Sequence, residues 1–195
     1  MFNINNYKHI LTMKRLALFF VVVVLTMTQI LAQESTFKKG DKVLNLSVGF
    51  GSGLYTGGGY TTSVPPLAAS FEVGVKDFDW KGSIGVGGIF AYGAHKWEYA
   101  GWGWKYTNII IGARGALHYP LAKKLDTYTG LVIGYNIVSS TEFGVNPIYD
   151  YSAKSSGVAY SWFVGARYYF TDRFAVLGEL GVGISYLNLG IALKF

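Results

Sequence analysis

Apolar and polar residues alternate along most of the chain after Gly40. From residue 187 to 195, large apolar side chains take every second position, and small or polar side chains take the positions between them. The same alternation runs through 44–50 and 67–75. A period of two residues is typical of a β-strand with one apolar face. After Gly40, no apolar stretch is long enough for a membrane helix, and glycines interrupt every helical spacing.

The alternation predicts eight strands, near 42–51, 67–75, 82–92, 106–119, 126–137, 158–170, 174–182 and 186–195. Each is long enough to cross a bilayer obliquely. The predicted connections alternate between short (76–81, 120–125, 171–173) and long (52–66, 93–105, 138–157), except for a tight last one around Gly183. This predicts an all-β fold, an eight-stranded antiparallel up-and-down transmembrane β-barrel with its short turns and both termini at one rim.

A soluble barrel of the lipocalin type is the alternative fold, because its strands also alternate and its apolar face lines a ligand cavity. That fold predicts charges spread along the strands. Nine charged residues instead sit at the short turns or one residue beyond them, namely Lys76, Asp77, Asp79, Lys81, Lys123, Lys124, Asp126, Asp172 and Arg173. This distribution favours the membrane barrel.

Composition agrees with a chain that meets lipid. Only 14% of the 195 residues are charged, 51% are hydrophobic and 17% are aromatic. Cysteine is absent from the sequence, so there is no disulfide framework, thiolate metal site, cysteine nucleophile or lipoprotein anchor.

Residues 1–32 have the pattern of a signal peptide. Lys14 and Arg15 precede a wholly apolar run from 16 to 25, and Ile30-Leu31-Ala32 provides a cleavage site before Gln33. The long polar stretch before Met13 suggests that translation starts at Met13. An uncleaved membrane helix over 16–32 is the alternative, although it is shorter than the about 20 residues that usually span a bilayer.

Loss of this leader removes three basic residues and no acidic one, which leaves 14 basic against 11 acidic residues in 33–195. The apparent basicity of the chain therefore largely disappears. We expect no nucleic-acid partner, because basic residues cluster only as Lys38-Lys39 and Lys123-Lys124 and no binding motif is present.

A hairpin plan occurs twice: Gly112-Ala113-Arg114 followed by Tyr119 is echoed by Gly165-Ala166-Arg167 followed by Tyr168-Tyr169-Phe170. With Glu179-Leu180-Gly181 and a terminal strand ending in Phe195, the chain resembles small outer-membrane β-barrels of the porin-like, OmpX and OmpA transmembrane-domain type over residues 42–195. The resemblance implies localisation in the bacterial outer membrane after export. It also implies that Phe195 acts as a signal read by the barrel assembly machinery. Fold alone does not establish function.

Strand parity predicts that five charged residues point into the lumen: Glu72, Arg114, Arg167, Glu179 and Lys194. Eight strands leave an interior that side chains fill, so these charges must be paired. We expect a bracing ion-pair network; a narrow ion path lined by the same residues is the alternative. Glycines that we expect to face the lumen give these side chains room: Gly85, Gly87, Gly112, Gly165 and Gly181.

Candidate catalytic chemistry is sparse. The outer-membrane lipid A deacylase family places its catalytic His two residues before a Ser, but His118 is followed by Tyr119-Pro120. We expect His118 to be a hydrogen-bonding residue at the rim or in the lumen. We expect no catalytic residue, no cofactor and no metal site.

Aromatic residues concentrate in one predicted long loop, which carries Trp97, Tyr99, Trp102, Trp104 and Tyr106. Loop 138–157 adds Phe143, Tyr149 and Tyr151. Such rings fit the aromatic girdle that membrane barrels carry at their interfaces, and an adaptable binding surface, in which aromatic anchors have small polar neighbours, is the alternative. The expected function is a structural or cell-surface interaction role, with an unknown extracellular ligand and outer-membrane lipid as partners. A narrow channel and a lipid-modifying enzyme are the alternatives.

Overall fold

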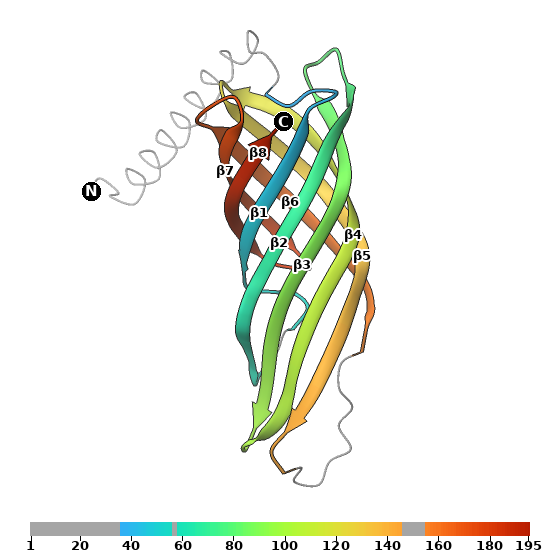
Figure 1. Ribbon diagram of the computed structural model, residues 1–195, viewed down its shortest axis with the longest axis vertical. Coiled ribbons are helices and arrows are strands. Elements are labelled where there is room, and N and C mark those ends of the chain that lie inside the picture. The colour runs from blue at the N-terminus through green and yellow to red at the C-terminus, as the bar shows by residue number, and fades with distance from the viewer. Residues whose placement is uncertain (1–35, 56–57, 146–154) are drawn as a thin grey trace, which may run out of the picture. The chain divides into compact units, whose positions relative to one another are not determined.

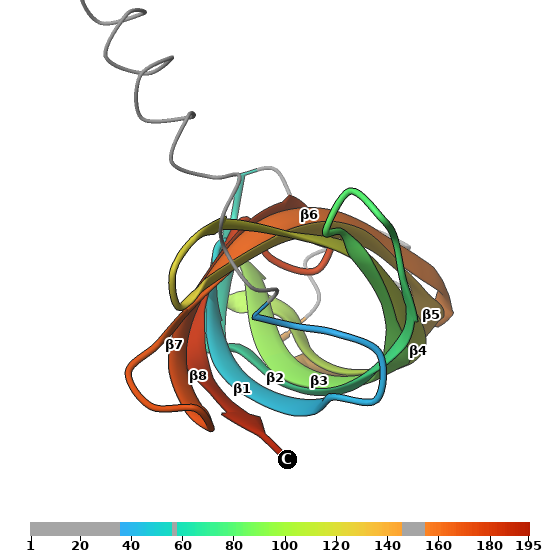
Figure 2. The same ribbon diagram turned by 90° about the horizontal axis from the view of Figure 1, so that it is seen from above.

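The computed structural model describes residues 36–55, 58–145 and 155–195, which form eight antiparallel strands. The strands are β1 (Lys42–Phe50), β2 (Tyr60–Asp77), β3 (Ser83–Tyr99), β4 (Trp102–Ala122), β5 (Leu125–Phe143), β6 (Gly157–Tyr169), β7 (Phe174–Val182) and β8 (Leu187–Lys194). Each pairs with its neighbours in chain order, and β8 pairs with β1, so the sheet is a closed barrel (Figures 1 and 2). The predicted fold class is confirmed. The predicted signal peptide lies outside the described residues.

The two faces of the barrel have opposite chemistry. Large apolar side chains point outward into the surroundings, among them Leu46, Phe71, Phe90, Ile111, Leu131, Ile133, Val164, Leu180 and Leu189. Charged and polar side chains are buried inside, including Glu72, Arg114, Asp126, Arg167 and Glu179. A water-soluble barrel has the reverse arrangement, so this exterior is that of a barrel embedded in lipid.

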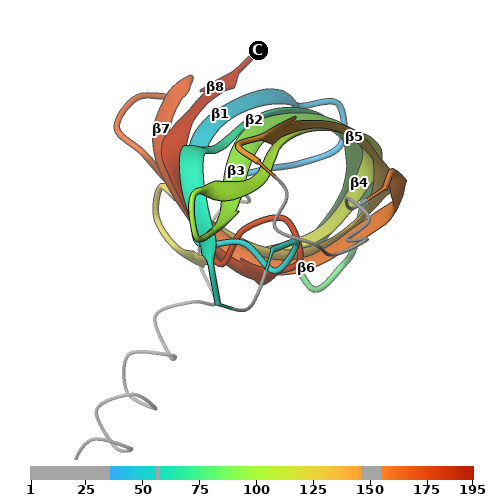
Figure 3. The ribbon, with the colours of Figure 1, turned by 90° about the horizontal axis from the view of Figure 1, so that it is seen from below.

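The short turns and the C-terminus lie at one rim, which is uppermost in Figure 1. The turns there connect β2 to β3, β4 to β5 and β6 to β7. Figure 3 looks onto the opposite rim, where β1, β3, β5 and β7 end. We call these the short-turn rim and the long-loop rim. No helix in the described ranges is long and apolar enough to cross a membrane.

Four strands are longer than the alternation predicted. β2 begins at Tyr60, β3 runs to Tyr99, β4 begins at Trp102 and β5 runs to Phe143. The prediction of a long loop over 93–105 is therefore wrong. These residues form a paired hairpin closed by Ala100-Gly101, whose φ angles are 50° and 81°. Two positive φ values define a type I′ turn, which suits the twist of a hairpin, but Ala-Gly is not its usual sequence.

Candidate functional site

The most buried part of the lumen centres on Arg167 of β6, which is 0% exposed. Its guanidinium donates to Glu72 at 2.7 Å, to Asp126 at 3.0 Å and to the Asn45 amide oxygen at 3.0 Å. Asn45 in turn donates to the Ser70 hydroxyl at 3.0 Å. These bonds join β1, β2, β5 and β6 across the lumen. Arg167 thus acts as a cross-brace that holds four strands together.

A second cation, Arg114 of β4, binds Glu179 of β7. Its Nη2 lies 2.5 Å from Glu179 Oε1, and its Nε lies 3.8 Å from Glu72 Oε2. The Tyr128 hydroxyl donates to the same Glu179 oxygen at 2.9 Å. The guanidinium also lies over the Phe163 ring, 3.8 Å from its centroid. Arg114 therefore links the Arg167 cluster to the far wall of the barrel.

His118 completes this lumen network, which we define as Glu72, Arg114, His118, Asp126, Arg167 and Glu179. Its Nδ1 lies 2.9 Å from Asp126 Oδ1, and its Nε2 contacts Glu72 Oε1. An ionised carboxylate can only accept hydrogen bonds, so an imidazolium that donates from both nitrogens satisfies both partners. The network then has equal numbers of positive and negative charges, which suits a low-dielectric interior.

The structure brings together four of the five predicted lumen charges, Glu72, Arg114, Arg167 and Glu179. Lys194 does not join them. Its Nζ lies 3.7 Å from Asp41 Oδ2 and donates to the Thr36 carbonyl at 3.1 Å. Because Lys194 ends β8 at the short-turn rim, its side chain reaches the N-terminal segment rather than the network.

Two network members were not predicted as such. The sequence pattern placed Asp126 at a short turn, whereas the structure buries its side chain, which is 1% exposed. His118 was expected only as a hydrogen-bonding residue, and the structure gives it two carboxylate partners. For His118, strand parity held the missing signal, because His118 is in phase with Arg114 along β4.

The N-terminal plug, residues 36–41, closes the short-turn mouth of the barrel, where Figure 2 shows the blue segment crossing the opening. Phe37 is 1% exposed and stacks on the His118 imidazole, with 4.1 Å between ring centroids. Its carbonyl accepts from the Ser83 hydroxyl at 2.8 Å. Gly40 donates to the Gly74 carbonyl at 2.9 Å. The plug thus separates the lumen network from water on this side, a feature that the sequence analysis did not predict.

Two of the predicted lumen glycines make direct room for the network. A Cβ built on Gly85 would lie 2.1 Å from Glu72 Oε1. One on Gly165 would lie 2.7 Å from the Tyr128 ring and 2.8 Å from Glu179 Cγ. At Gly87, Gly112 and Gly181 the nearest atoms are instead backbone oxygens of the neighbouring strand.

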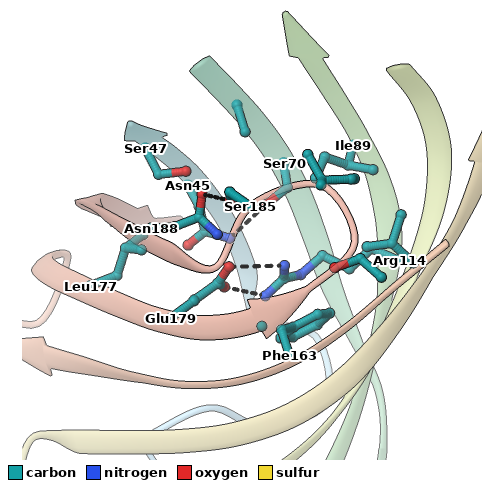
Figure 4. A pocket seen from close by; sticks show the side chains of 15 residues that line it. Asn45, Ser47, Ser70, Ile89, Arg114, Phe163, Leu177, Glu179, Ser185 and Asn188 are labelled. Atoms are coloured by element: carbon teal, nitrogen blue, oxygen red, sulfur yellow. Dashed lines mark hydrogen bonds and ion pairs between the residues drawn. The ribbon is translucent and has the colours of Figure 1, made fainter. Parts of the chain in front are cut away.

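A small cavity lies beside the Arg114–Glu179 pair (Figure 4). Its volume is about 30 Å³, and Asn45, Ser70 and Asn188 are among the polar residues that line it. A volume of this size holds one or two water molecules. The cavity is thus too small to form an aqueous channel through the lumen.

The long-loop mouth is also filled from within. The Gly53 amide donates to the Gly183 carbonyl at 2.9 Å, so residues 51–55 meet the 183–186 connection inside the barrel. Tyr55 stacks on His95 with 4.4 Å between centroids and donates to Asn108 at 2.9 Å. Burial raises the pKa of the Tyr55 phenol to about 12, although the Asn108 hydrogen bond lowers it. Tyr55 therefore remains a neutral donor at physiological pH.

Four strands continue beyond this mouth as a protruding wall, which we define as 60–66, 93–99, 102–108 and 138–143. Figure 1 shows β3, β4 and β5 extending well past β1, β7 and β8. The wall contains the five residues predicted for a surface-binding loop, and they lie on paired strands: Trp97 opposes Trp104, and Tyr99 opposes Trp102. The loop assignment is thus corrected for Trp97, Tyr99, Trp102 and Trp104, while Tyr106 lies in β4 as the strand predicted from 106 implies.

Only part of this aromatic set is available to a ligand. Tyr106 is 1% exposed and packs at 5.2 Å from Tyr55, so it belongs to the seal of the mouth. Trp102 is 3% exposed and donates to Glu142 at 2.5 Å. Tyr99 is 67% exposed, while Trp97 and Trp104 are half-buried. Tyr149 and Tyr151 of the second predicted loop lie outside the described residues, and Phe143 ends β5.

The two histidines in the described ranges, His95 and His118, are enclosed in the barrel. His118 is 1% exposed and faces the lumen, so it does not reach lipid outside the barrel. His95, expected in a loop, lies on β3 and is 4% exposed beneath Tyr55. Within the ranges that the structure describes, no group of three or more His, Cys, Asp or Glu residues is arranged to hold a metal ion.

Closed strand order, apolar exterior and ionic interior together define an eight-stranded transmembrane β-barrel. No protein-family model matches the chain, and no curated protein does.

Several solved structures are similar to this chain. The N-terminal β-barrel domain of Pseudomonas aeruginosa OprF is 13% identical, with 80% of this chain and 98% of that chain covered and a TM-score of 0.46. Ail of Yersinia pestis, in complex with the heparin analogue sucrose octasulfate, is 12% identical, with coverages of 80% and 99% and a TM-score of 0.48. The outer membrane protein OprG of Pseudomonas aeruginosa is 12% identical, with coverages of 84% and 99% and a TM-score of 0.44.

Proposed function

We propose that this chain is a non-enzymatic barrel of the bacterial outer membrane that acts at the cell surface through its protruding wall. The observation that carries the proposal is the contrast between a sealed lumen and an extended rim. The lumen is braced by buried ion pairs and closed by the N-terminal plug, while four strands extend past the opposite mouth. Because the lumen is closed to solutes, the proposed role is binding of an extracellular ligand at the protruding wall.

Orientation follows from the placement of the C-terminus and the short turns at one rim. In outer-membrane barrels the short turns face the periplasm and the longer connections face the exterior. The protruding wall then faces the surroundings of the cell, with Tyr99 at its tip and Trp97 and Trp104 behind it. Rigid aromatic side chains provide contact area at a low entropic cost, and here the paired strands hold them in place.

A narrow channel is the second candidate, and single-channel recording in a planar bilayer tests it. We expect a folded barrel without discrete conductance steps, since the cavity beside Arg114 has only about 30 Å³. Arg114→Ala and Glu179→Ala are the companion variants. Discrete steps in the unmodified protein that either substitution alters would replace the surface role with a channel.

Deletion of 97–104 tests the surface role directly. It removes the tip of the hairpin and leaves Lys96 and Lys105 as a two-residue turn after the His95–Tyr106 pair, so the barrel is expected to fold. The protein in nanodiscs is applied to an array of neutral, acidic and sulfated glycans and extracellular-matrix proteins. We expect binding to at least one probe that the deletion abolishes.

The control for this deletion is Trp80→Ala, which removes an exposed aromatic side chain from the short-turn rim. Its array binding should equal that of the unmodified protein. Absence of binding to every probe, or binding that survives the deletion, contradicts the surface role. Loss of the folded barrel on deletion would assign the aromatic residues to an interfacial girdle instead.

Phe195 is proposed to act during assembly. Its ring is 70% exposed, and its amide donates to the Lys42 carbonyl at 2.9 Å, so the side chain is free at the seam where β8 meets β1. Phe195→Ala should lower the amount of barrel inserted in cells while leaving the stability of the purified barrel unchanged. An equal loss in stability would make Phe195 a packing residue.

A further inference from the structure

The outer face of the protruding wall carries a row of four polar residues in direct register. Thr61 opposes Lys96, Lys96 opposes Lys105, and Lys105 opposes Thr141. Residues directly opposite on neighbouring strands point to the same face, with Cβ atoms about 5 Å apart. The row therefore places two ammonium groups between two hydroxyl groups on adjacent strands.

This arrangement has a surplus of positive charge. Like charges directly opposite each other destabilise a sheet. Glu98 pairs with Lys96, and both ammonium groups lie over the Phe143 ring, with Nζ at 4.7 Å from its centroid for Lys96 and 5.8 Å for Lys105. No carboxylate in the described part of the chain forms an ion pair with Lys105. Glu98 thus neutralises Lys96, and the ammonium group of Lys105 has no paired carboxylate among the described residues.

Among the residues that the structure describes, the pair is also isolated from other basic residues. On the long-loop side, within 36–55, 58–145 and 155–195, Lys96 and Lys105 are the basic residues that the sequence contains. The remaining described cations lie in the lumen network or near the short-turn rim. In the described part of this rim, the registered pair is therefore a local anion-attracting feature.

The same outer face continues directly into the apolar exterior. Along β3, the outward positions preceding Lys96 are Ala94, Tyr92 and Phe90. Tyr92 and Phe90 line an apolar exterior groove of about 540 Å³ together with Leu46, Val48, Leu67, Ala69, Leu189 and Ile191. A transmembrane strand crosses the apolar layer in about 9–11 residues. Counted from Ile84, this layer ends near Ala94, so Lys96 lies at headgroup level.

From these observations we propose that the Thr61–Lys96–Lys105–Thr141 row binds the phosphate of a lipid in the leaflet on the long-loop side, with acyl chains in the groove below. Long lysine side chains reach along a surface to place their charge at the polar layer. Lipid is favoured over a soluble anion because the cations and the apolar groove share one continuous outward face. This site is separate from the aromatic tip that carries the proposed surface role.

The test measures which lipid the whole protein retains. The protein is reconstituted in vesicles containing equal amounts of phosphatidylcholine and phosphatidic acid with identical acyl chains, then extracted, and the retained lipids are counted by native mass spectrometry. We expect enrichment of phosphatidic acid. Lys96→Gln and Lys105→Gln should each lower this enrichment about fivefold, the effect of one basic residue near an anionic lipid surface.

Lys123→Gln with Lys124→Gln is the control, because it removes two positive charges from the opposite rim, one more than either test variant removes from the row. This control should retain the enrichment, and so should Lys96→Arg with Lys105→Arg. Heat-dependent gel mobility establishes that every variant is folded. The proposal is overturned if Lys96→Gln and Lys105→Gln leave the enrichment of phosphatidic acid unchanged. It is also overturned if Lys123→Gln with Lys124→Gln lowers this enrichment as much as they do. Displacement of the lipid by inorganic phosphate at equal phosphate concentration would also overturn it, in favour of a soluble anion.

Discussion

The two ends of this barrel are built from different interactions. At the short-turn end, charged side chains from several strands meet inside the lumen, and the N-terminal plug seals them under Phe37. At the long-loop end, the strands continue past the mouth and present half-buried and exposed aromatic rings. The comparison indicates that the short-turn end stabilises the barrel and that the long-loop end presents a surface for binding. Substitutions should therefore have large effects on unfolding at the first end and small ones at the second.

Arg167→Ala should have the largest effect. It leaves Glu72 and Asp126 buried without their cation, and breaking a buried pair from one side costs about 3–5 kcal/mol. The free energy of unfolding, measured by urea titration in lipid vesicles, reports this loss. Arg173→Ala, in an exposed turn, is the control and should change stability by less than about 0.5 kcal/mol. Equal effects would contradict a central role for the lumen network.

Phe37→Ala should come next, with a loss of about 3 kcal/mol, the lower part of the range for removing a buried Phe side chain. The same titration measures it. Lys38→Ala in the same plug is the control, because its side chain is exposed. If Phe37→Ala behaves like Lys38→Ala, the plug does not contribute to barrel stability.

Gly85→Ala should cost about 1–3 kcal/mol, as expected when a methyl group is forced into a packed interior. The added Cβ would lie 2.1 Å from Glu72 Oε1, so the carboxylate must move within its network. Gly115→Ala is a matched control on β4, because nothing lies within 4 Å of a Cβ built there. A neutral Gly85→Ala would show that the network tolerates displacement.

Tyr99→Ala should have the smallest effect on stability, within about 0.5 kcal/mol, because surface substitutions rarely exceed this. Its side chain is 67% exposed at the hairpin tip. The same substitution should weaken array binding if the wall carries the surface role. A large stability loss here would remove the proposed division between the two ends.

In the lumen, the sequence pattern predicted which charged side chains point inward but not which of them form ion pairs. Parity along each strand indicated that Glu72, Arg114, Arg167 and Glu179 point inward, and the structure places all four inside. Strand parity did not predict which of these charged side chains form ion pairs with each other. Arg167 meets Asp126, 41 positions away, and Glu72, 95 positions away, because strand register brings them to one level.

In the protruding wall, the alternation of apolar and polar residues was insufficient to predict the strands. The aromatic and glycine-rich residues over 93–105 were interpreted as a loop. In the structure they form paired strands, and the pairing begins with Tyr99 opposite Trp102, next to the turn. The Ala100-Gly101 turn provides little sequence signal, and pairing between these segments is decided by the strands that lead into them. The plug was missed for a related reason: Phe37 is one aromatic residue in a polar segment, and only the assembled mouth gives it a partner.

The sequence by itself determined the barrel, its strand count and the opposite chemistry of its two faces, because alternation is a local property of an extended chain. Only the tertiary structure decided the composition of the lumen network, the seating of the plug and the continuation of four strands into a wall. These depend on register and closure, which bring distant segments together at fixed levels around the barrel.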